Sequence, residues 1–577
     1  MSQSIAEAFE DGLDLQIGLV QTIPQDSRSA WLGYPFPSLA PLGEEEMRTF
    51  RTIILENPFL RVTILPGMGG RIISLFDKRT GTEILKRHPS IVPLAGSRRG
   101  VTVREGIQLI LDGEERLNAL GNVSSQIEVS GDEESEAAVW LSETFTGTGI
   151  GFHLRISIPP DQAVVQIEAR VLNRWLKPQP YNAGLSIYLG DGAFDGQTFY
   201  STDRRAGLGV FATDHVFDGV EHADDRLSFL RFGGVRELAP RQVDNWALTL
   251  VPYSGLPSIS GSSVDAAASF NDGNLLVQST QQRLGHKLFL LTKEGNTLEA
   301  KVDLYPENLL EIPLDGISPT GLVLKDPAKK ELLRLDSLTG WTDTWAAKKF
   351  EPTTVVSHIG ILNRESSDLE LKRATYDVST RHLAYILLGM KALHEKRPED
   401  AALAFEQSLM YNADDPLAWW TKAVALRLAE GDNQAELLNA HYLAPLEPAL
   451  RAESFLSQPI NLDVDANPLL TSLAENPEEF IEVACLLIEA GLFDQASRWI
   501  DEALRHRDLP MLRYLMAYCL IEATRLDAEA SDQVRLAGEA PLAPPFPFRE
   551  VEIHALNALL KAFPNNSRLA LLNTLIH

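Results

Sequence analysis

The stretch Leu55–Leu85, LENPFLRVTILPGMGGRIISLFDKRTGTEIL, constrains the fold of this chain more than any other. It has the pattern of a strand, a glycine-rich turn, a second strand and a polar turn, with apolar residues alternating along the strands. Gly67, Gly69 and Gly70 allow backbone conformations that strain residues carrying a Cβ, and Arg71 follows them at the start of the second strand. This run predicts a hairpin that opens a large antiparallel sandwich.

The region 48–365 has the texture of a β-domain, with runs such as FHLRISIP, AVVQIEARVLN and KLFLLT between turn signals. In AVVQIEARVLN, Val165, Ile167 and Ala169 alternate with polar residues, which is typical of a strand with one buried face. No helical pattern is interleaved, so an antiparallel sandwich is expected rather than a parallel βαβ sheet. The proline-punctuated region 1–47 is expected to be an arm on its surface.

Beyond residue 380 the pattern becomes helical and repeats. Large and small residues recur at an offset of 34 positions, in the pairs Tyr385 and Trp419, Gly389 and Ala423, Ala401 and Ala435, Phe480 and Tyr514, Cys485 and Cys519, and Ala496 and Ala530. This period is that of tetratricopeptide repeats, in which small residues let two antiparallel helices cross closely. We expect a linker at 366–380 and an α-solenoid at 381–577, with an irregular insert near 450–477 that breaks the register.

Composition limits the possible partners. The 577 residues carry 79 acidic and 52 basic side chains, a net charge of −27, which repels a phosphate backbone and argues against nucleic acid. No run is apolar for the roughly 18 residues that a membrane span needs, and the N-terminus lacks a signal-peptide pattern, so we expect a cytoplasmic protein that does not enter the membrane.

Two cysteines give neither a disulfide framework nor a four-ligand zinc set. A loop at 214–225 gathers two histidines and four aspartates, but their spacing fits no metal motif, and a solvated acidic loop is expected there. We therefore expect no metal and no cofactor.

The hairpin at Leu55–Leu85 resembles the entry hairpin of the galactose-mutarotase-like supersandwich, the fold of aldose 1-epimerases. The segment Pro545–His577, PFPFREVEIHALNALLKAFPNNSRLALLNTLIH, is similar to a signature of domain-of-unknown-function family 5107, which joins a mutarotase-like domain to tetratricopeptide-type repeats. Members usually continue past this segment, so this chain is expected to be a divergent and shorter one. The resemblance implies an antiparallel β-supersandwich followed by an α-solenoid. It also implies a carbohydrate ligand for the sandwich and a protein partner for the repeats, but no settled reaction.

The resemblance also implies site residues. RLGHKLFLL looks like the family's GHK segment and makes His286 a general acid, while NLLEIPLDG places Glu311 at an acidic position and makes it a general base. Arg71 and Gln108 would contact the sugar; Gln108, in REGIQLIL, stands where the family has a glutamate in a pattern like GGIE. Tyr181 lies in the run corresponding to the family's tryptophan-rich strand and would offer an aromatic face.

Each assignment has a structural alternative. Glu311 sits between apolar residues and could mark the wet face of a strand, and His286 could be a satisfied structural histidine. Arg71 could pair with Asp77 or Glu83 and hold the hairpin together.

Two functions follow from these residues. The first is an active carbohydrate enzyme, an epimerase or a glycoside hydrolase or lyase, with Glu311 as base and His286 as acid. The second is a carbohydrate-binding protein without catalysis, whose repeats bind another protein. An amide such as that of Gln108 cannot exchange a proton near neutral pH, which favours the second. The enzyme requires Arg71, Gln108, His286 and Glu311 to converge on one open cleft.

Overall fold

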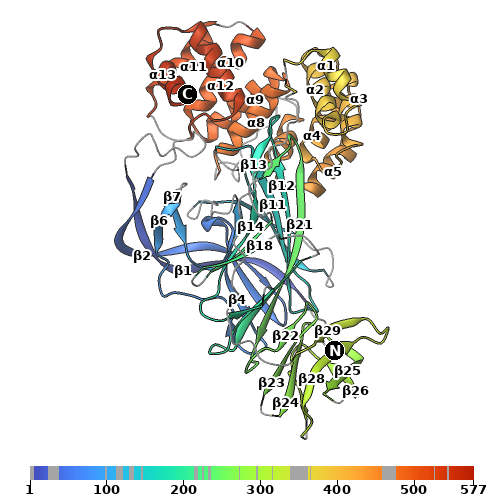
Figure 1. The fold of residues 1–577 in the computed structure, drawn as a ribbon. Coiled ribbons are helices and arrows are strands. Elements are labelled where there is room, and N and C mark those ends of the chain that lie inside the picture. Colours follow the sequence, from blue (N-terminus) through green and yellow to red (C-terminus); the bar gives the residue numbers. More distant parts are fainter. Residues whose placement is uncertain are drawn as a thin grey trace.

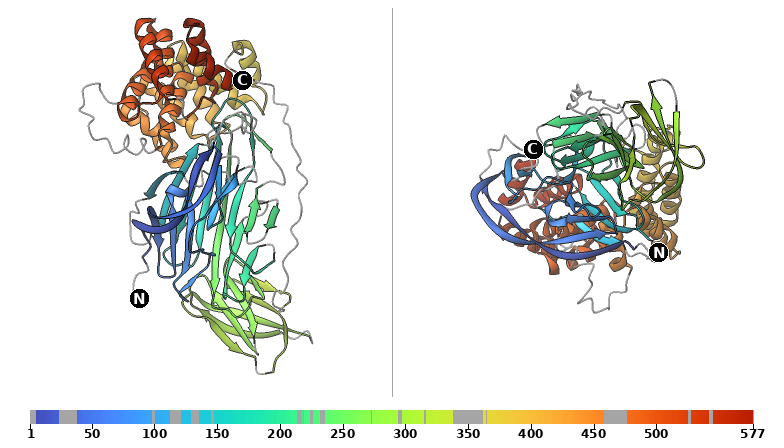
Figure 2. Two further views of the ribbon diagram at one scale, coloured as in Figure 1. Left: turned by 90° about the vertical axis from the view of Figure 1, so that its left-hand side faces the viewer. Right: turned by 90° about the horizontal axis from the view of Figure 1, so that it is seen from below.

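The computed structural model of the protein has three tiers, with two β-sandwiches below a cap of helices (Figures 1 and 2). It describes residues 5–23, 38–97, 100–111, 121–128, 135–144, 147–195, 197–212, 217, 219–223, 226–231, 236–271, 273–293, 297–314, 316–337, 362–363, 365–457, 476–524, 527–541 and 545–576. The predicted order of antiparallel β-sandwich followed by a helical repeat region is confirmed. No helix within these ranges is long and apolar enough to cross a membrane.

The main sandwich packs two antiparallel sheets face to face. The first sheet runs in the order β1-β2-β3-β4-β8-β14-β19-β18, with β5 beside β4. Its strands are β1 (Glu7–Ile23), β2 (Ser38–Glu56), β3 (Leu60–Leu65), β4 (Arg71–Asp77), β5 (Thr82–Glu83), β8 (Ile107–Leu111), β14 (Ala183–Tyr188), β18 (Gly219–Ala223) and β19 (Arg226–Leu230).

The second sheet runs in the order β15-β16-β17-β21-β12-β11-β10-β9. Its strands are β9 (Ser124–Glu128), β10 (Ala137–Thr144), β11 (Ile150–Ile158), β12 (Val165–Asn173), β15 (Ala193–Phe194), β16 (Thr198–Ser201), β17 (Ala206–Ala212) and β21 (Val243–Ser254). The alternation predicted for β12 is confirmed, because Val165, Ile167 and Ala169 all enter the core between the two sheets. Two two-stranded sheets accompany the sandwich. One is the hairpin of β6 (Pro93–Ser97) and β7 (Gly100–Val103), and the other pairs β13 (Gln179–Tyr181) with β20 (Arg236–Leu238), which are far apart in the chain.

A small sandwich lies at the end of the main one that is farthest from the helices (Figure 1). One sheet holds β22 (Gly261–Ser262), β23 (Ala266–Asn271), β24 (Asn274–Ser279) and β27 (Leu310–Pro313). The other holds β25 (Arg283–Thr292), β26 (Thr297–Leu304), β28 (Pro319–Lys325) and β29 (Glu331–Leu335). Leu275, Leu288 and Leu322 belong to a separate apolar core between these sheets. The region predicted as one sandwich therefore contains two.

The expected N-terminal arm is part of the main sandwich. β1 pairs with β2 along nearly its whole length, from Glu7 opposite Glu56 to Ile23 opposite Ser38, and the boundary expected at residue 47 falls inside β2. The outer part of β2, in GEEEMR, is exposed on both faces, so it lacks the alternation that reveals a strand in the sequence. The segment expected as a linker at 366–380 likewise contains a helix, α1 (Asp368–Ala374), which begins with a capping box at Ser367.

The helices form antiparallel hairpins, as the 34-residue period predicted. At Gly389 an added Cβ would lie 2.6 Å from the ring of Phe405 on the next helix, so the small residue is needed where the two helices cross. The helices are α2 (Arg381–His394), α3 (Pro398–Leu409), α4 (Pro416–Leu428), α5 (Gln434–Leu443), α6 (Pro448–Leu456), α8 (Glu478–Glu489), α9 (Phe493–His506), α10 (Pro510–Thr524), α11 (Asp527–Glu539), α12 (Glu550–Ala562) and α13 (Ser567–Ile576). Most of the expected insert, residues 458–475, lies outside the described residues.

Candidate functional site

The glycine turn between β3 and β4 places Arg71 inside the main sandwich. Gly69 and Gly70 both adopt φ 71°, the left-handed region that glycine reaches without strain. The chain turns through them, and Arg71 is fully buried. Its guanidinium donates through Nη1 to the carbonyl oxygen of Glu105 and through Nη2 to Oε1 of Gln108. The structure therefore brings two predicted site residues, Arg71 and Gln108, into direct contact.

The hairpin carboxylates considered as alternative partners of Arg71 have other partners of their own. Asp77 forms an ion pair with Arg79 at 2.7 Å, and Glu83 accepts a hydrogen bond from the Ser74 hydroxyl at 2.5 Å. The hairpin is thus held together by carboxylate contacts other than an ion pair of Arg71 with Asp77 or Glu83.

Gln108 belongs to a polar row that crosses three neighbouring strands. In the antiparallel register, Gln108 on β8 lies opposite Ser186 on β14, which in turn lies opposite Ser228 on β19. Their neighbours along each strand, such as Ile107 and Leu185, enter the core between the sheets. Because successive side chains of a strand point to opposite faces, the polar row lies on the face of the sheet that points away from that core.

One edge of the polar row carries a histidine and a carboxylate in contact. His88 approaches Oε1 of Glu105 through its ring Nδ1, and its backbone N–H donates to the same oxygen at 3.1 Å. Glu105 is 3% exposed, whereas the His88 side chain is 41% exposed. Burial raises the pKa of Glu105, and the contact with His88 opposes that rise only in part. His88 is therefore the member of this group that reaches solvent.

The carboxylate and the amide of this group each have one buried atom without a hydrogen-bond partner among the described residues. These atoms are Oε2 of Glu105 and Nε2 of Gln108, an acceptor and a donor. A buried polar atom without a partner costs about 1–3 kcal/mol, so such atoms call for an explanation. A hydroxyl group can donate to the first and accept from the second. The arrangement thus suits a ligand that carries hydroxyl groups.

The other three predicted site residues do not join this group. Tyr181 is packed into the core of the main sandwich and its hydroxyl donates to Asp244 Oδ2 at 2.7 Å, while burial raises its pKa well above the ordinary value. The aromatic side chain on the face of the polar row is instead Tyr188, two residues after Ser186 on β14. The prediction of Tyr181 as an aromatic sugar contact is thus not supported by its position, because alternation along the run decides which tyrosine faces which way.

His286 and Glu311 lie in the small sandwich, on different sheets. His286 on β25 is buried on the side that carries Leu288, and its Nδ1 lies 3.0 Å from the carbonyl oxygen of Leu284. Glu311 on β27 is exposed and accepts a hydrogen bond from Asn274 at 2.6 Å. The expected convergence of these two residues with Arg71 and Gln108 on one cleft is therefore wrong. The position of Glu311 is the wet strand face given as its alternative.

Sequence reasoning missed Glu105 although a signal was present. In REGIQ, the glutamine stands at the family's acidic position, and Glu105 stands three positions earlier, at the first glycine of the GGIE-like pattern. Gly106 between them has φ 68°, and a Cβ there would lie 2.2 Å from the carbonyl oxygen of Ile72. The carboxylate and the amide are thus held against β4 by a glycine. Of the 214–225 loop, the side chains of both histidines and all four aspartates lie outside the described residues.

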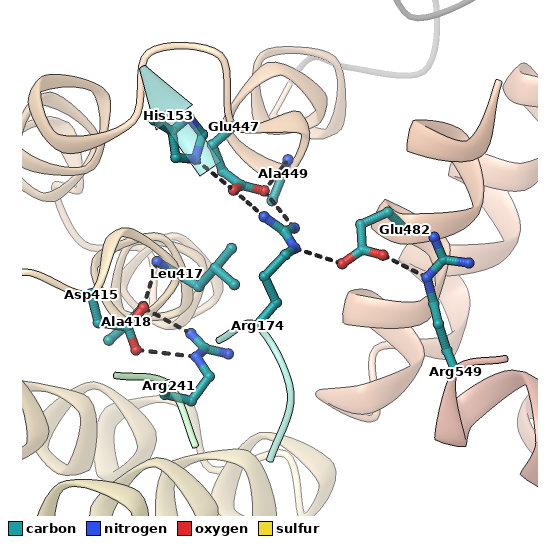
Figure 3. A network of polar contacts seen from close by, with 10 residues as sticks. All are labelled: His153, Arg174, Arg241, Asp415, Leu417, Ala418, Glu447, Ala449, Glu482 and Arg549. Atoms are coloured by element: carbon teal, nitrogen blue, oxygen red, sulfur yellow. Dashed lines mark hydrogen bonds and ion pairs between the residues drawn. The ribbon is translucent and has the colours of Figure 1, made fainter. Parts of the chain in front are cut away.

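A second concentration of buried polar groups joins the main sandwich to the helices (Figure 3). Arg174, in the loop after β12, makes a bidentate contact with Glu447 and donates through Nε to Glu482 Oε1 at 2.7 Å. Glu482 also accepts from Arg549 Nε at 2.5 Å, and His153 Nε2 lies 3.8 Å from Glu447. We call these five residues the ionic junction.

The buried carboxylates of the ionic junction are kept ionised by the neighbouring arginines. Burial would raise the pKa of Glu447, yet the positive charge of Arg174 and the hydrogen bonds from its guanidinium, with His153 nearby, outweigh burial and leave this pKa well below its ordinary value. The pKa of Glu482 is lowered in the same way, against burial, by Arg174 and Arg549. Glu447 also caps α6 by accepting from the backbone N–H of Ala449 at 3.3 Å.

A buried pair beside the ionic junction fixes another helix start. Arg241, held at φ 59°, donates to Asp415 through Nε at 3.1 Å and Nη2 at 3.2 Å. Asp415 also accepts from the backbone N–H groups of Leu417 and Ala418, which caps α4. The sandwich thus supplies arginines to carboxylates that begin two helices of the repeats.

Three comparisons with known proteins give matches to parts of this chain or to most of it. The structure is similar to that of a TPR-domain containing protein from Parabacteroides distasonis, at 14% identity, with 98% of this chain and 96% of that chain covered and a TM-score of 0.38. It is also similar to that of a galactose mutarotase-like protein from Clostridium acetobutylicum, at 8% identity, with 36% of this chain and 96% of that chain covered and a TM-score of 0.26. Residues 33–189 match the family model described as "Domain of unknown function (DUF5107)". The match is to the family that the sequence resemblance named, and it lies in the β-region, whereas the segment Pro545–His577 lies outside the matched residues.

Proposed function

We propose that the protein binds a carbohydrate at the polar row of the main sandwich without turning it over, and that the helical repeats bind a protein partner. The observation that carries the first part is the pair of buried, unpartnered atoms, Glu105 Oε2 and Gln108 Nε2. A sugar hydroxyl offers a donor and an acceptor together, which is the complement of this pair. His88, exposed at the edge of the row, marks the side from which the ligand approaches.

The positions of the expected acid and base support binding without turnover. Epimerisation needs a base at the anomeric hydroxyl and an acid at the ring oxygen, on opposite sides of one sugar. His286 and Glu311 lie on separate sheets of the small sandwich, one turned inward and the other outward. At the edge of the polar row, His88 and Glu105 contact each other directly, so they do not form an opposed acid and base. The enzyme alternative, in which Glu311 is the base and His286 the acid, therefore has less support.

The ionic junction supports a connection between partner binding by the repeats and sugar binding by the sandwich. Arg174 reaches from a sandwich loop to Glu447 at the start of α6 and to Glu482 within α8, so the two parts meet through directional contacts. Such contacts are made in one relative orientation only. A partner on the repeats would then sit at a fixed place relative to the sugar.

Calorimetry of the full chain against a glycan panel tests the sandwich site. Glu105→Gln replaces a carboxylate oxygen by an amide N–H, and we expect binding of any glycan that the parent protein binds to weaken about tenfold or more, because a buried acceptor is lost. Glu311→Gln is the matched control: it makes the same chemical change on the small sandwich and should leave binding unaltered.

Two results would contradict the proposed site. One is a loss of glycan binding in Glu311→Gln that equals the loss in Glu105→Gln. The other is a parent protein that binds no member of the panel. Circular dichroism and thermal unfolding of each variant would establish that it is folded before binding is compared.

A further inference from the structure

A cavity of about 600 Å³ opens among the helical repeats, lined by residues of α2, α8, α9, α10 and α12. Its wall carries four rings in an edge-to-face series. The ring centroids of His394 and Phe493 are 6.1 Å apart, those of Phe493 and Tyr518 are 6.0 Å apart, and those of Tyr518 and His554 are 5.9 Å apart, all T-shaped. We call these four residues the ring series.

Rings arranged in this way are suited to hold a cation. In an edge-to-face pair one ring turns its edge, which is partly positive, to the face of the next. A cation placed over a free face is attracted by the ring quadrupole and gains about 0.5–2 kcal/mol, more when water is displaced. Met390 and Leu387 add an apolar surface to the same cavity, which suits the methylene stem of an arginine or lysine.

The charges around the cavity have the matching sign. Its lining includes five carboxylates and a single ammonium: Glu365, Glu395, Glu489, Glu522, Glu550 and Lys391. The ammonium of Lys391 already donates to Asp368 at 3.0 Å and to the Ser366 carbonyl oxygen at 2.7 Å. Arg397 and Lys177 contact Glu395 and Glu550 from outside. The lining is net negative, so an anionic ligand would not be favoured and a cationic one would be attracted.

Near the cavity, the protein already binds one of its own guanidinium groups with an aromatic ring and a carboxylate. The guanidinium of Arg549 lies over the Phe548 ring, 4.2 Å from its centroid, and donates to Glu482 at 2.5 Å. Arg549 is a member of the ionic junction and directly precedes α12, the helix that contributes Glu550 to the cavity. A buried guanidinium is therefore held beside the cavity by the same two kinds of group that line it.

From the ring series and its surrounding carboxylates, we propose that the cavity receives an arginine or lysine side chain from a basic segment of a partner protein. This inference rests on the proposed partner-binding role of the repeats and names the chemistry of the partner. The cation lies against the ring series, its stem covers Met390 and Leu387, and carboxylates such as Glu522 meet the flanking basic residues. The cavity volume lies in the range of sites that enclose a few side chains.

Fluorescence anisotropy with a labelled short peptide, in which arginine alternates with leucine, tests the inference on the full chain. The same peptide with citrulline in place of arginine keeps the shape and removes the charge. We expect the arginine peptide to bind and the citrulline peptide to bind at least tenfold more weakly. Phe493→Leu should weaken the arginine peptide on the order of tenfold, because a ring face is lost while the charge is kept.

Carboxylate variants separate this site from general attraction to an acidic protein. Glu522→Gln, at an exposed cavity position, should weaken binding about threefold, and Glu522→Lys should abolish it. Glu529→Gln, on the exposed side of α11 and outside the cavity, is the matched control and should change nothing. Because Glu522 is exposed, both of its variants should fold even if Phe493→Leu does not.

Equal losses in Glu522→Gln and Glu529→Gln, or equal affinities for the arginine and citrulline peptides, would overturn the inference. Glycan binding should be the same in the Glu522 variants as in the parent. Peptide binding without glycan binding would refute the sandwich site alone. Glycan binding without peptide binding would refute the basic-segment site alone.

Discussion

Replacing Arg174 by methionine should destabilise the protein severely, and the ionic junction shows why. The guanidinium is 2% exposed and makes three charge-assisted hydrogen bonds, two to Glu447 and one to Glu482. Methionine has a similar length but no charge. Glu482 would keep Arg549 at 2.5 Å, whereas Glu447 would keep only His153 at 3.8 Å and a backbone N–H. The variant would therefore leave one carboxylate buried without its main counter-ion.

The expected cost is about 4 kcal/mol. Breaking a buried ion pair by removing one partner typically costs about 3–5 kcal/mol, and Arg174 serves two carboxylates. Arg505→Met is the control, since its side chain is 68% exposed and pairs with Asp501 at 2.8 Å; it should cost less than about 1 kcal/mol. Adding Glu447→Gln to the first variant should recover part of the loss, because the uncompensated charge is then gone.

The loss of stability in Arg174→Met should also depend on pH. In the parent the folded-state pKa of Glu447 is depressed, so its stabilising contribution is present above the pKa of the unfolded chain, near 4.3, and is lost as pH falls towards the folded value. Without Arg174, burial raises that pKa, and the variant is penalised above pH 4.3. The two proteins should therefore approach each other in stability on acidification. Urea unfolding followed by helical circular dichroism at pH 8 and pH 5 measures this. A gap that stays constant, or a cost like that of Arg505→Met, would refute the reasoning.

Three further predictions concern the same contacts. Gly106→Ala should cost more than about 3 kcal/mol, since its Cβ would lie 2.2 Å from a β4 carbonyl oxygen, whereas Gly81→Ala, with φ 70° and open space around it, should cost about 1 kcal/mol; thermal unfolding compares the two. Burial raises the folded-state pKa of Glu479 to about 7, so the free energy of unfolding of the parent should fall as pH rises from about 4.3 to 7. Glu479→Gln should remove that dependence on pH and be about 1–3 kcal/mol more stable than the parent at pH 8. Urea unfolding at several pH values measures this, and the same pH dependence in both proteins would contradict it. Asp415→Asn should destabilise α4 less than Asp415→Ala, because the amide keeps an acceptor for the helix cap and a weaker one for Arg241, and hydrogen exchange of α4 distinguishes them.

Local patterns in the sequence predicted local structure. Alternation identified β12 with its buried face, and the 34-residue offset located the helix crossings, as at Gly389 against Phe405. The glycine turn predicted where Arg71 emerges. Each of these features depends on residues within one strand, one turn or one helical hairpin.

The site residues required long-range information that the pattern does not hold. Alternation tells which residues share a face of a strand, but not to which sheet the strand belongs, so the sequence does not reveal that His286 and Glu311 lie in a second, smaller sandwich away from Arg71 and Gln108. The contact between Arg174 and Glu447 joins residues 273 positions apart, and that with Glu482 joins residues 308 apart. Neither has a local signature, because an arginine in a loop and a glutamate at a helix start are each ordinary alone.

The composition of the ionic junction indicates what it contributes. Burying several charges is costly, and a well-packed apolar contact of the same size is often at least as stable, so added stability is a weak reason for such a network. Directional pairs are satisfied in only one arrangement, whereas an apolar face tolerates sliding. We therefore propose that the junction acts chiefly on orientation, by keeping the polar row of the sandwich and the cavity of the repeats in one relative position. If so, Arg174→Met together with Glu447→Gln should keep glycan and peptide binding separately intact while hydrogen exchange at the starts of α6 and α8 rises. Unchanged exchange there would mean that apolar packing alone sets the orientation.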